Sequence, residues 1–377
     1  MFFKDVIGQD LVKAFLLKQV ADDEIPHAQL FAGPEGGGKL ALVLAYARFL
    51  LCQNRGEQDA CGSCPSCIKV SSLQHPDLHF SYPIIAPAKS GQKKVSDLFL
   101  DRWRARLINS PYFTTEDWKD DLVAENKQLN IAVDEAESII KKLTLAAYGG
   151  TYKIMIIWLP EYMNAQTANK LLKQLEEPGP GTLFMMVCND TEQLLSTILS
   201  RMQVTKVHLP SEEVLSTFLM ENHGLSQERA LEIAHFVDGN VNEAYKLLTN
   251  NMSNNEHFEQ LAQWMRACYS NDAQQLVPIA EKLHKSGREA VKSFLEYVLH
   301  FFRQCIVANY GREELTRLTA DEAKFASKFA PFINHLNVLE LTEAIEAAHN
   351  DVSRNVYTRL VLLHTSFQVH KLLRRAE

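Results

Sequence analysis

Two hydrophobic patterns alternate along the first 210 residues. Short, continuously apolar runs are separated by segments in which apolar residues recur every three or four positions. Continuous runs are typical of buried strands, and the longer spacing is typical of helices that bury one face. Strands that alternate with helices predict a parallel, doubly wound α/β sheet. The predicted strands are 27–32, 78–82, 152–159, 182–188 and 204–209. The predicted helices are 10–20, 39–51, 134–147, 164–177 and 194–202.

The pattern changes after Pro210, where the strand-like runs stop. Three short helices are predicted at 212–222, 226–237 and 241–248, and only longer helical patterns follow an asparagine-rich linker at 250–255. Segment 84–130 fits neither pattern and is predicted to be an insertion with one helix. We therefore expect three domains, which are an α/β domain over 1–210, a three-helix lid over 211–252 and an all-α collar over 253–377.

Composition narrows the class of protein. The 377 residues are 46% hydrophobic and 23% charged, as in an ordinary soluble protein. No apolar stretch approaches the roughly 20 residues that cross a bilayer. The first residues carry Asp5 and no apolar core, so we expect no signal peptide and a cytoplasmic location. The net charge of −7 argues against a whole-surface polyanion binder, although it allows a local basic patch.

Four of the seven cysteines lie within sixteen residues, at Cys52, Cys61, Cys64 and Cys67. Four thiolates at this spacing can close a tetrahedral zinc site, and a closed site is structural rather than catalytic. An iron–sulfur cluster and a set of reactive or disulfide-forming thiols are the alternatives. The remaining three lie on apolar patterns and are predicted to be buried core thiols. They are Cys188, Cys268 and Cys305.

A glycine-rich segment, Gly33 to Lys39, follows a predicted strand and opens a predicted helix. It matches the phosphate-binding loop G-x-x-x-x-G-K, whose backbone N–H groups cradle phosphates at a helix N-terminus. The next residue is Leu40, where working loops carry Ser or Thr to hold Mg²⁺. Leucine offers no oxygen to that cation. Gly33, Gly38 and Lys39 could still hold a phosphate, so we expect binding of ATP or ADP to be either weak or absent.

The acids that complete an ATPase site are also missing. The buried strand that should end in them ends in Trp158 and Leu159. Glu161 lies two positions further on, and we interpret it as a surface residue at a strand–helix turn. The sequence therefore predicts that the chain does not hydrolyse ATP.

Several segments together resemble the clamp-loader branch of the AAA+ superfamily, and within it the family of delta-prime subunits of bacterial DNA polymerase III. The resemblance covers about residues 1–250, the insertion excepted. The segments that carry it are 5–9 (DVIGQ), 26–34 (PHAQLFAGP), the cysteine module, 75–77 (HPD), 131–135 (IAVDE), 171–178 (LLKQLEEP) and Ser200-Arg201.

This resemblance implies roles for individual residues. Asn189 matches the polar sensor-one residue, whereas Asn242 stands where the lid helix usually carries a sensing arginine. Ser200-Arg201 matches the first two residues of the Ser-Arg-Cys motif, and Met202 stands in the third position. In the family, the arginine of this motif reaches the γ-phosphate of a neighbouring subunit. The Mg²⁺-binding hydroxyl, the acids and the sensing arginine are therefore all missing from the chain's own nucleotide site. The arginine that would act at a neighbour's site, Arg201, is kept.

The resemblance therefore implies a non-hydrolysing, stator-like subunit with a structural Zn²⁺. Its implied partners are gamma/tau ATPase subunits and delta in a hetero-pentamer, with the sliding clamp and primer–template DNA reached through the assembly. The chain would be a component of the DNA polymerase III holoenzyme without intrinsic ATPase activity.

Two alternatives stay open on the sequence, an active gamma/tau-type ATPase subunit and a stand-alone zinc-dependent nucleic-acid-binding protein. In the insertion, Lys93-Lys94 and Arg102-Trp103-Arg104 offer cation and stacking contacts to nucleic acid. A solvated amphipathic decoration is the favoured interpretation of that segment.

Overall fold

A computed structural model describes residues 1–85, 93–123, 128–144, 147–148, 151–249, 254–311, 316, 318, 320–354 and 356–374. The chain forms two compact units, Met1–Lys246 and Leu247–Glu377. Most of the predicted linker, residues 250–253, lies outside the described residues. Within the described part, none of the helices has the length and apolar character that a membrane span requires.

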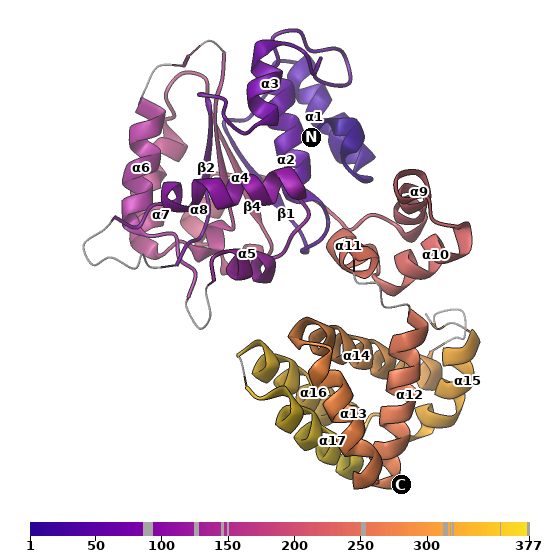
Figure 1. The fold of residues 1–377 in the computed structure, drawn as a ribbon. Helices are drawn as coiled ribbons and strands as arrows, with labels where there is room; N and C mark the ends of the chain where they lie inside the picture. Colours follow the sequence, from indigo (N-terminus) through magenta and orange to yellow (C-terminus); the bar gives the residue numbers. More distant parts are fainter. Residues whose placement is uncertain are drawn as a thin grey trace. The chain divides into compact units, whose positions relative to one another are not determined.

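The first unit contains a five-stranded sheet in the order β2-β3-β4-β1-β5, with every neighbouring pair parallel (Figure 1). This confirms the predicted parallel α/β sheet. The strands are β1 Ala28–Ala32, β2 Leu78–Ser81, β3 Lys153–Trp158, β4 Thr182–Cys188 and β5 Gln203–Lys206. The helices around them are α1 Asp10–Ala21, α2 Lys39–Leu51, α3 Pro65–Ser71, α6 Val133–Thr144, α7 Ala165–Glu176 and α8 Ser196–Leu199.

The central strands β1, β3 and β4 are buried on both faces, which explains why they are largely apolar, whereas the edge strand β5 is mostly exposed. Alternate residues of β1, β3 and β4, among them Leu30, Ile157 and Met186, form a core cluster with side chains of α6, α7 and α8. The opposite face packs on α2, in which all thirteen residues are buried. Because parallel strands end at the same edge, the loops after β1, β3 and β4 come together there.

The described part of the insertion contains two α-helices, α4 Leu100–Asn109 and α5 Thr115–Asp121, so the prediction of one helix is wrong. The chain turns at Pro111, and Thr114 then caps a new helix by accepting from the backbone N of Asp117. The segment is amphipathic in α4, as predicted, with Arg102 on the exposed face, but it is more than a solvated decoration, because Trp103 and Trp118 are both 0% exposed.

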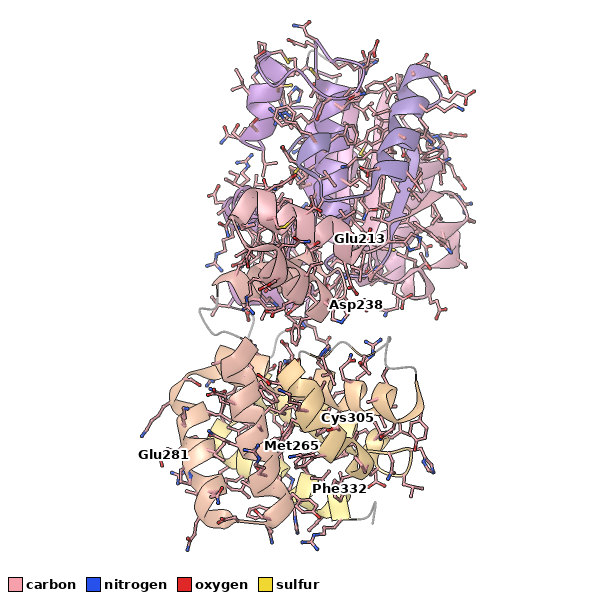
Figure 2. All side chains as sticks on the ribbon, turned by 90° about the vertical axis from the view of Figure 1, so that its right-hand side faces the viewer. Glu213, Asp238, Met265, Glu281, Cys305 and Phe332 are labelled. Atoms are coloured by element: carbon pink, nitrogen blue, oxygen red, sulfur yellow. The ribbon has the colours of Figure 1, made fainter. Side chains whose placement is uncertain are left out.

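Among the described residues after the sheet, the regular elements are helices alone, as predicted. The first unit contains α9 Glu212–His223 and α10 Gln227–Phe236, and α11 Val241–Thr249 begins in it and ends just beyond its last residue, Lys246. The second unit contains α12 Asn254–Ser270, α13 Ala273–Lys285, α14 Arg288–Tyr310, α15 Ala320–Phe329, α16 Val338–Ser353 and α17 Thr358–Arg374. Met265 and Cys305 belong to its buried core (Figure 2). Cys188, Cys268 and Cys305 are all buried, which confirms them as core thiols.

Candidate functional site

The glycine-rich loop connects β1 to α2 at the carboxyl edge of the sheet. Gly38 precedes the helix with a φ of 79°, a conformation that glycine adopts without strain. Lys39 opens α2, and its Nζ donates to the carbonyl oxygens of Gly33 at 2.6 Å and Pro34 at 2.5 Å. The lysine that reaches phosphate in a working loop is therefore bonded to the backbone of its own loop.

Lys39 is nearly inaccessible, with 5% of its surface exposed. Burial lowers the pKa of Lys39 to about 8, and the nearby carboxylates of Glu35 and Glu161 act against that shift. A buried cation is costly unless hydrogen bonds and opposite charges compensate it. Here the loop carbonyls and the two carboxylates supply that compensation from within the chain.

Asn189 follows β4 and lies beside the loop. Its side-chain Nδ2 donates to Glu35 Oε1 at 2.8 Å, and its backbone N donates to Glu161 Oε1 at 2.9 Å. The same Glu35 oxygen accepts from the backbone N of Thr115 at 3.1 Å and from its hydroxyl at 2.6 Å. Glu35 therefore links the loop both to the sheet edge and to the insertion.

The end of β3 carries no acid toward this loop. Trp158 is 4% exposed and packs its ring on Phe113, with ring centroids 5.0 Å apart. Our interpretation of Glu161 as a surface residue is wrong, because its Oε1 is bonded to Asn189 and its Oε2 is buried. Burial raises the pKa of Glu161. The turn after Pro160 directs this carboxylate inward, an orientation that sequence spacing does not specify.

The loop is also bonded to distant parts of the first unit. Gln9 Nε2 donates to the carbonyl oxygens of Gly37 at 3.2 Å and His208 at 2.5 Å. The backbone N of Val241, at the start of α11, donates to the Gly36 carbonyl at 3.2 Å. The helical segment after the sheet is thus attached directly to the loop.

The four cysteines of the module come together as predicted. Their sulfurs all lie within 4.8 Å of one another. Cys52 Sγ is 3.5 Å from that of Cys61 and 4.0 Å from that of Cys64. Ligands about 2.3 Å from a central zinc at tetrahedral corners are about 3.8 Å apart. The spacing therefore fits a metal that takes four thiolates.

Backbone N–H groups point at three of these sulfurs. Cys61 N donates to Cys52 Sγ at 3.3 Å, Cys64 N to Cys61 Sγ at 3.4 Å, and Cys67 N to Cys64 Sγ at 3.4 Å. Such donors stabilise thiolates, and those from Cys64 and Ser63 lower the pKa of the exposed Cys61 to about 6. The cluster can therefore bind a metal ion with its backbone already arranged around the sulfurs.

Two features attach the cysteine cluster to the rest of the unit. Phe2 packs against the cluster, and the guanidinium carbon of the buried Arg48 lies 3.8 Å from the centre of its ring. His75 Nε2 is hydrogen-bonded to the Ser66 hydroxyl at 3.1 Å, while its Nδ1 accepts from the backbone N of Asp77. The H-P-D segment therefore joins α3 to the start of β2.

Ser200 and Arg201 follow α8 at the surface of the first unit. Arg201 Nε donates to Glu176 Oε1 at 2.7 Å, and its terminal nitrogen NH1 donates to the Thr197 carbonyl at 2.8 Å and to the Ser200 hydroxyl at 3.2 Å. The side chain stays 33% exposed. An oriented, accessible guanidinium of this kind can contact an anion outside the chain.

Three of the basic residues singled out in the insertion have partners within the chain: Lys93 pairs with Glu137, and Arg102 and Arg104 donate to backbone carbonyls. The Trp103 ring stacks on Tyr82 with ring centroids 4.1 Å apart. Arg102 donates to the Asp121 carbonyl and Arg104 to the Leu73 carbonyl. Without an exposed ring, Arg102-Trp103-Arg104 lacks the stacking platform that a single-strand binding surface requires.

The structure thus brings the predicted residues into three groups. Gly33, Gly38, Lys39 and Asn189 meet at the sheet edge, the four cysteines cluster, and Ser200-Arg201 lies after α8. Sequence reasoning missed Glu35 and Glu176. Both lie inside recognised segments, but a surface glutamate carries no spacing signal that reveals its partner.

Comparisons with known proteins place these sites in a family context. The model of a protein family described as "DNA polymerase III, delta subunit" matches residues 8–211. The chain is 28% identical over 242 residues to the DNA polymerase III subunit delta' of Bacillus subtilis and 30% identical over 175 residues to that of Pseudomonas aeruginosa. It is 24% identical over 252 residues to the DNA polymerase III subunit tau of Salmonella typhimurium.

These matches are partial on both sides. They cover 64%, 46% and 65% of this chain, in the same order. The matched segments span 60%, 41% and 32% of the lengths of those relatives.

Proposed function

Because the chain belongs to the family described as DNA polymerase III, delta subunit, we propose that it is a non-hydrolysing, delta-prime-type subunit of an AAA+ clamp loader. In this role it supplies Arg201 to the nucleotide site of a neighbouring ATPase subunit. The chain's own loop takes no part in turnover.

One contrast carries the proposal. Arg201 is oriented and accessible, whereas Lys39 is buried and bonded to its own loop. Leu40 and Trp158 further deprive the loop of a Mg²⁺ ligand and an acid. A guanidinium placed against a neighbour's γ-phosphate stabilises the charge of the transition state. ATP hydrolysis in the neighbouring subunit can therefore depend on a subunit that does not itself hydrolyse ATP.

The proposed partners follow from the relatives. Subunits named tau and delta' both match this chain, so we propose that it assembles with gamma/tau-type ATPase subunits and delta in a pentamer. Through that assembly it would help to load a sliding clamp onto primed DNA in the cytoplasm. In this proposal, residues 1–210 form the nucleotide-binding fold, residues 211–252 form the lid, and residues 253–377 form the collar that contacts the other subunits.

We further propose that Cys52, Cys61, Cys64 and Cys67 hold one structural zinc ion. The sulfur spacing and the three backbone donors support a closed four-thiolate site. Bound zinc would cross-link the loop after α2 to α3. With all four positions taken by protein sulfurs, the ion has no position open for a substrate.

The test is reconstitution of the loader with wild type or Arg201→Ala, followed by single-turnover hydrolysis at the neighbouring site. That rate should fall by about 10³-fold or more, while size-exclusion chromatography shows the same assembly. Arg229→Ala is the matched control, because Arg229 also lies in a surface ion pair, with Glu232. An unchanged rate in an assembled Arg201→Ala loader refutes the arginine role.

A further inference from the structure

The connection between α4 and α5, together with the first turn of α5 (residues 111–117), covers the phosphate loop. A cavity of about 370 Å³ lies along the start of the loop, at Gly33, Pro34 and Asn189. At the helix end of the loop, the remaining space is a cavity of about 20 Å³, bounded by Gly38 and Lys39, by Pro111, Tyr112 and Phe113, and by Trp158. A cavity of this size holds about one water molecule. Small-molecule sites usually enclose several hundred Å³, so a nucleotide phosphate chain does not fit while this connection is in place.

Tyr112 closes the helix end of the loop. Its ring lies so close to Gly38 that a Cβ added at Gly38 would come within 2.7 Å of Tyr112 Cε1. The Tyr112 hydroxyl accepts from the backbone N of Ile7 at 3.0 Å, and the residue is 6% exposed. The ring is thus fixed at both ends over the N-terminus of α2, where phosphates bind in working loops.

Thr115 holds the opposite side of the loop. Its backbone N and hydroxyl both donate to Glu35 Oε1, at 3.1 and 2.6 Å. Glu35 is the second residue after Gly33, inside the segment that would wrap a phosphate. A carboxylate held there by Thr115 and Asn189 also places negative charge where an anion would enter.

The connection between the helices is anchored in the core. Phe113 packs on Trp158, the residue that stands in place of a catalytic acid, and on Trp103, with ring centroids 5.0 and 5.7 Å away. Trp118 Nε1 donates to the Pro83 carbonyl at 2.8 Å. Aromatic packing of this extent makes displacement of the connection costly.

The same connection holds the lid helix α11. Asp117 accepts from Asn242 Nδ2 at 3.1 Å and pairs with Lys246 Nζ at 3.5 Å. The rings of Tyr112 and Tyr245 lie 6.1 Å apart. Asn242 occupies the position at which the family resemblance implies a nucleotide-sensing arginine. The carboxylate of Asp117 therefore contacts the residue at this position, where a phosphate would contact the arginine.

From these contacts we infer that residues 111–117 are a built-in plug that fills the chain's own nucleotide site and fixes the lid in one position. The plug takes the place of ATP or ADP, so the loop and lid keep one conformation through the cycle of the neighbouring subunits. The inference goes beyond the proposed function, because it concerns binding at this chain's own loop and does not require Arg201 to act on a neighbour.

The experiment is ADP binding to the purified full-length chain, measured by isothermal titration calorimetry. The opened variant is Tyr112→Ala with Thr115→Ala, which removes the loop contacts and leaves the tryptophans in place. The control is Lys119→Ala, which changes a partly exposed side chain of α5 outside the plug. Wild type and control should show no binding at about 1 mM ADP. The opened variant should bind ADP with a dissociation constant of about 0.1 mM or less, at least about ten times tighter.

Adding Lys39→Ala to the opened variant should abolish the new binding. Wild type that binds ADP as tightly as the opened variant, or a folded opened variant that binds none, overturns the plug. If the double variant does not fold, Glu35→Ala removes the contact with Thr115 from the loop side. A folded Glu35→Ala variant that binds no ADP, or that binds it only as tightly as wild type, then overturns the plug. Neither result bears on hydrolysis in the reconstituted loader, so failure of the plug and failure of the arginine role are separable.

Discussion

Arg201 is held by Glu176, the last residue of α7, through a hydrogen bond of 2.7 Å from Nε to Oε1 and a second contact from its terminal nitrogen NH2. The pair joins the ends of α7 and α8 at the surface. Both residues lie in segments that carry the family resemblance, 171–178 and Ser200-Arg201, but the sequence does not indicate that they contact each other. Glu176 therefore acts as a positioning residue, because it limits the directions in which the guanidinium can point.

Replacement of Glu176 by Ala should weaken the arginine without removing it. Half-exposed ion pairs contribute at most about 1 kcal/mol, so we expect hydrolysis at the neighbouring site to fall about two- to fivefold, far less than for Arg201→Ala. Single-turnover ATPase of the reconstituted loader measures this. Glu177→Ala is the control one residue further on. Hydrolysis at the wild-type rate in Glu176→Ala would show that the contact does not orient Arg201.

The purified chain should hydrolyse no ATP above background. Lys39 is bonded to the Gly33 and Pro34 carbonyls, and Leu40 offers no oxygen to Mg²⁺. Phosphate release, followed with and without Mg²⁺, should therefore be the same for wild type and Lys39→Ala. Robust turnover that Lys39→Ala abolishes would contradict the assignment as a non-hydrolysing subunit.

Metal analysis should find about one zinc per chain. Cys67→Ser replaces a ligand that is 0% exposed, so the variant should lose zinc and become less stable. Cys188→Ser is the matched control, since Cys188 is also buried but lies in β4, outside the cluster. Mass spectrometry of the purified proteins reports the metal. A metal-free wild type that is fully folded, or iron in place of zinc, would count against this prediction.

Sequence reasoning worked best where one local signal decides the structure. The uninterrupted apolar run of β4 and the Gly-rich start of α2 gave elements with the predicted bounds. The cysteine spacing likewise predicted the cluster, because short turns leave four nearby thiols few other arrangements.

The insertion was the main failure, because its structure depends on contacts that are distant in sequence. Trp103 and Trp118 have polar and charged neighbours, which is the pattern of an exposed segment, yet both are buried and pack on each other, and Trp103 also packs on Trp158 at the end of β3. The plug was unpredictable for the same reason. Nothing local to Tyr112 indicates that its ring lies on Gly38, more than seventy residues earlier in the chain.

Trp103→Ala should strongly destabilise the first unit. The ring is fully buried among Tyr82, Phe113, Trp118 and Trp158. Removal of such a side chain costs about 3–5 kcal/mol through lost burial and the cavity left behind. Urea unfolding followed by tryptophan fluorescence, in a Trp264→Phe background that silences the second unit, measures the change.

Ile108→Ala is the control for that substitution. Ile108 lies in the same helix, is 63% exposed, and should change the free energy of unfolding by about 0.5 kcal/mol or less. A similarly small effect of Trp103→Ala would mean that the insertion is not part of the core.

The first unit should lose stability in mild acid because of His79 in β2. Burial, with Lys142 next, lowers the pKa of His79 to about 4, whereas an unfolded histidine titrates near pH 6.5. Between these values the unfolded chain binds more protons than the folded one. Stability therefore rises with pH across this window and is lost as the pH falls from about 6.5 to about 4. After discounting for the partly exposed ring, the loss should be on the order of 2 kcal/mol.

His79→Gln removes the titrating group, so it should flatten this part of the pH profile relative to wild type. His364→Gln, at an exposed position of α17, should leave the profile unchanged. The measurement is urea unfolding in the Trp264→Phe background at closely spaced pH values from 4 to 7. Carboxylates that titrate in the same range contribute equally to all three proteins, so the difference between the His79→Gln and wild-type curves isolates the histidine. Parallel curves across the whole range would mean that His79 titrates in the folded protein as it does in the unfolded chain.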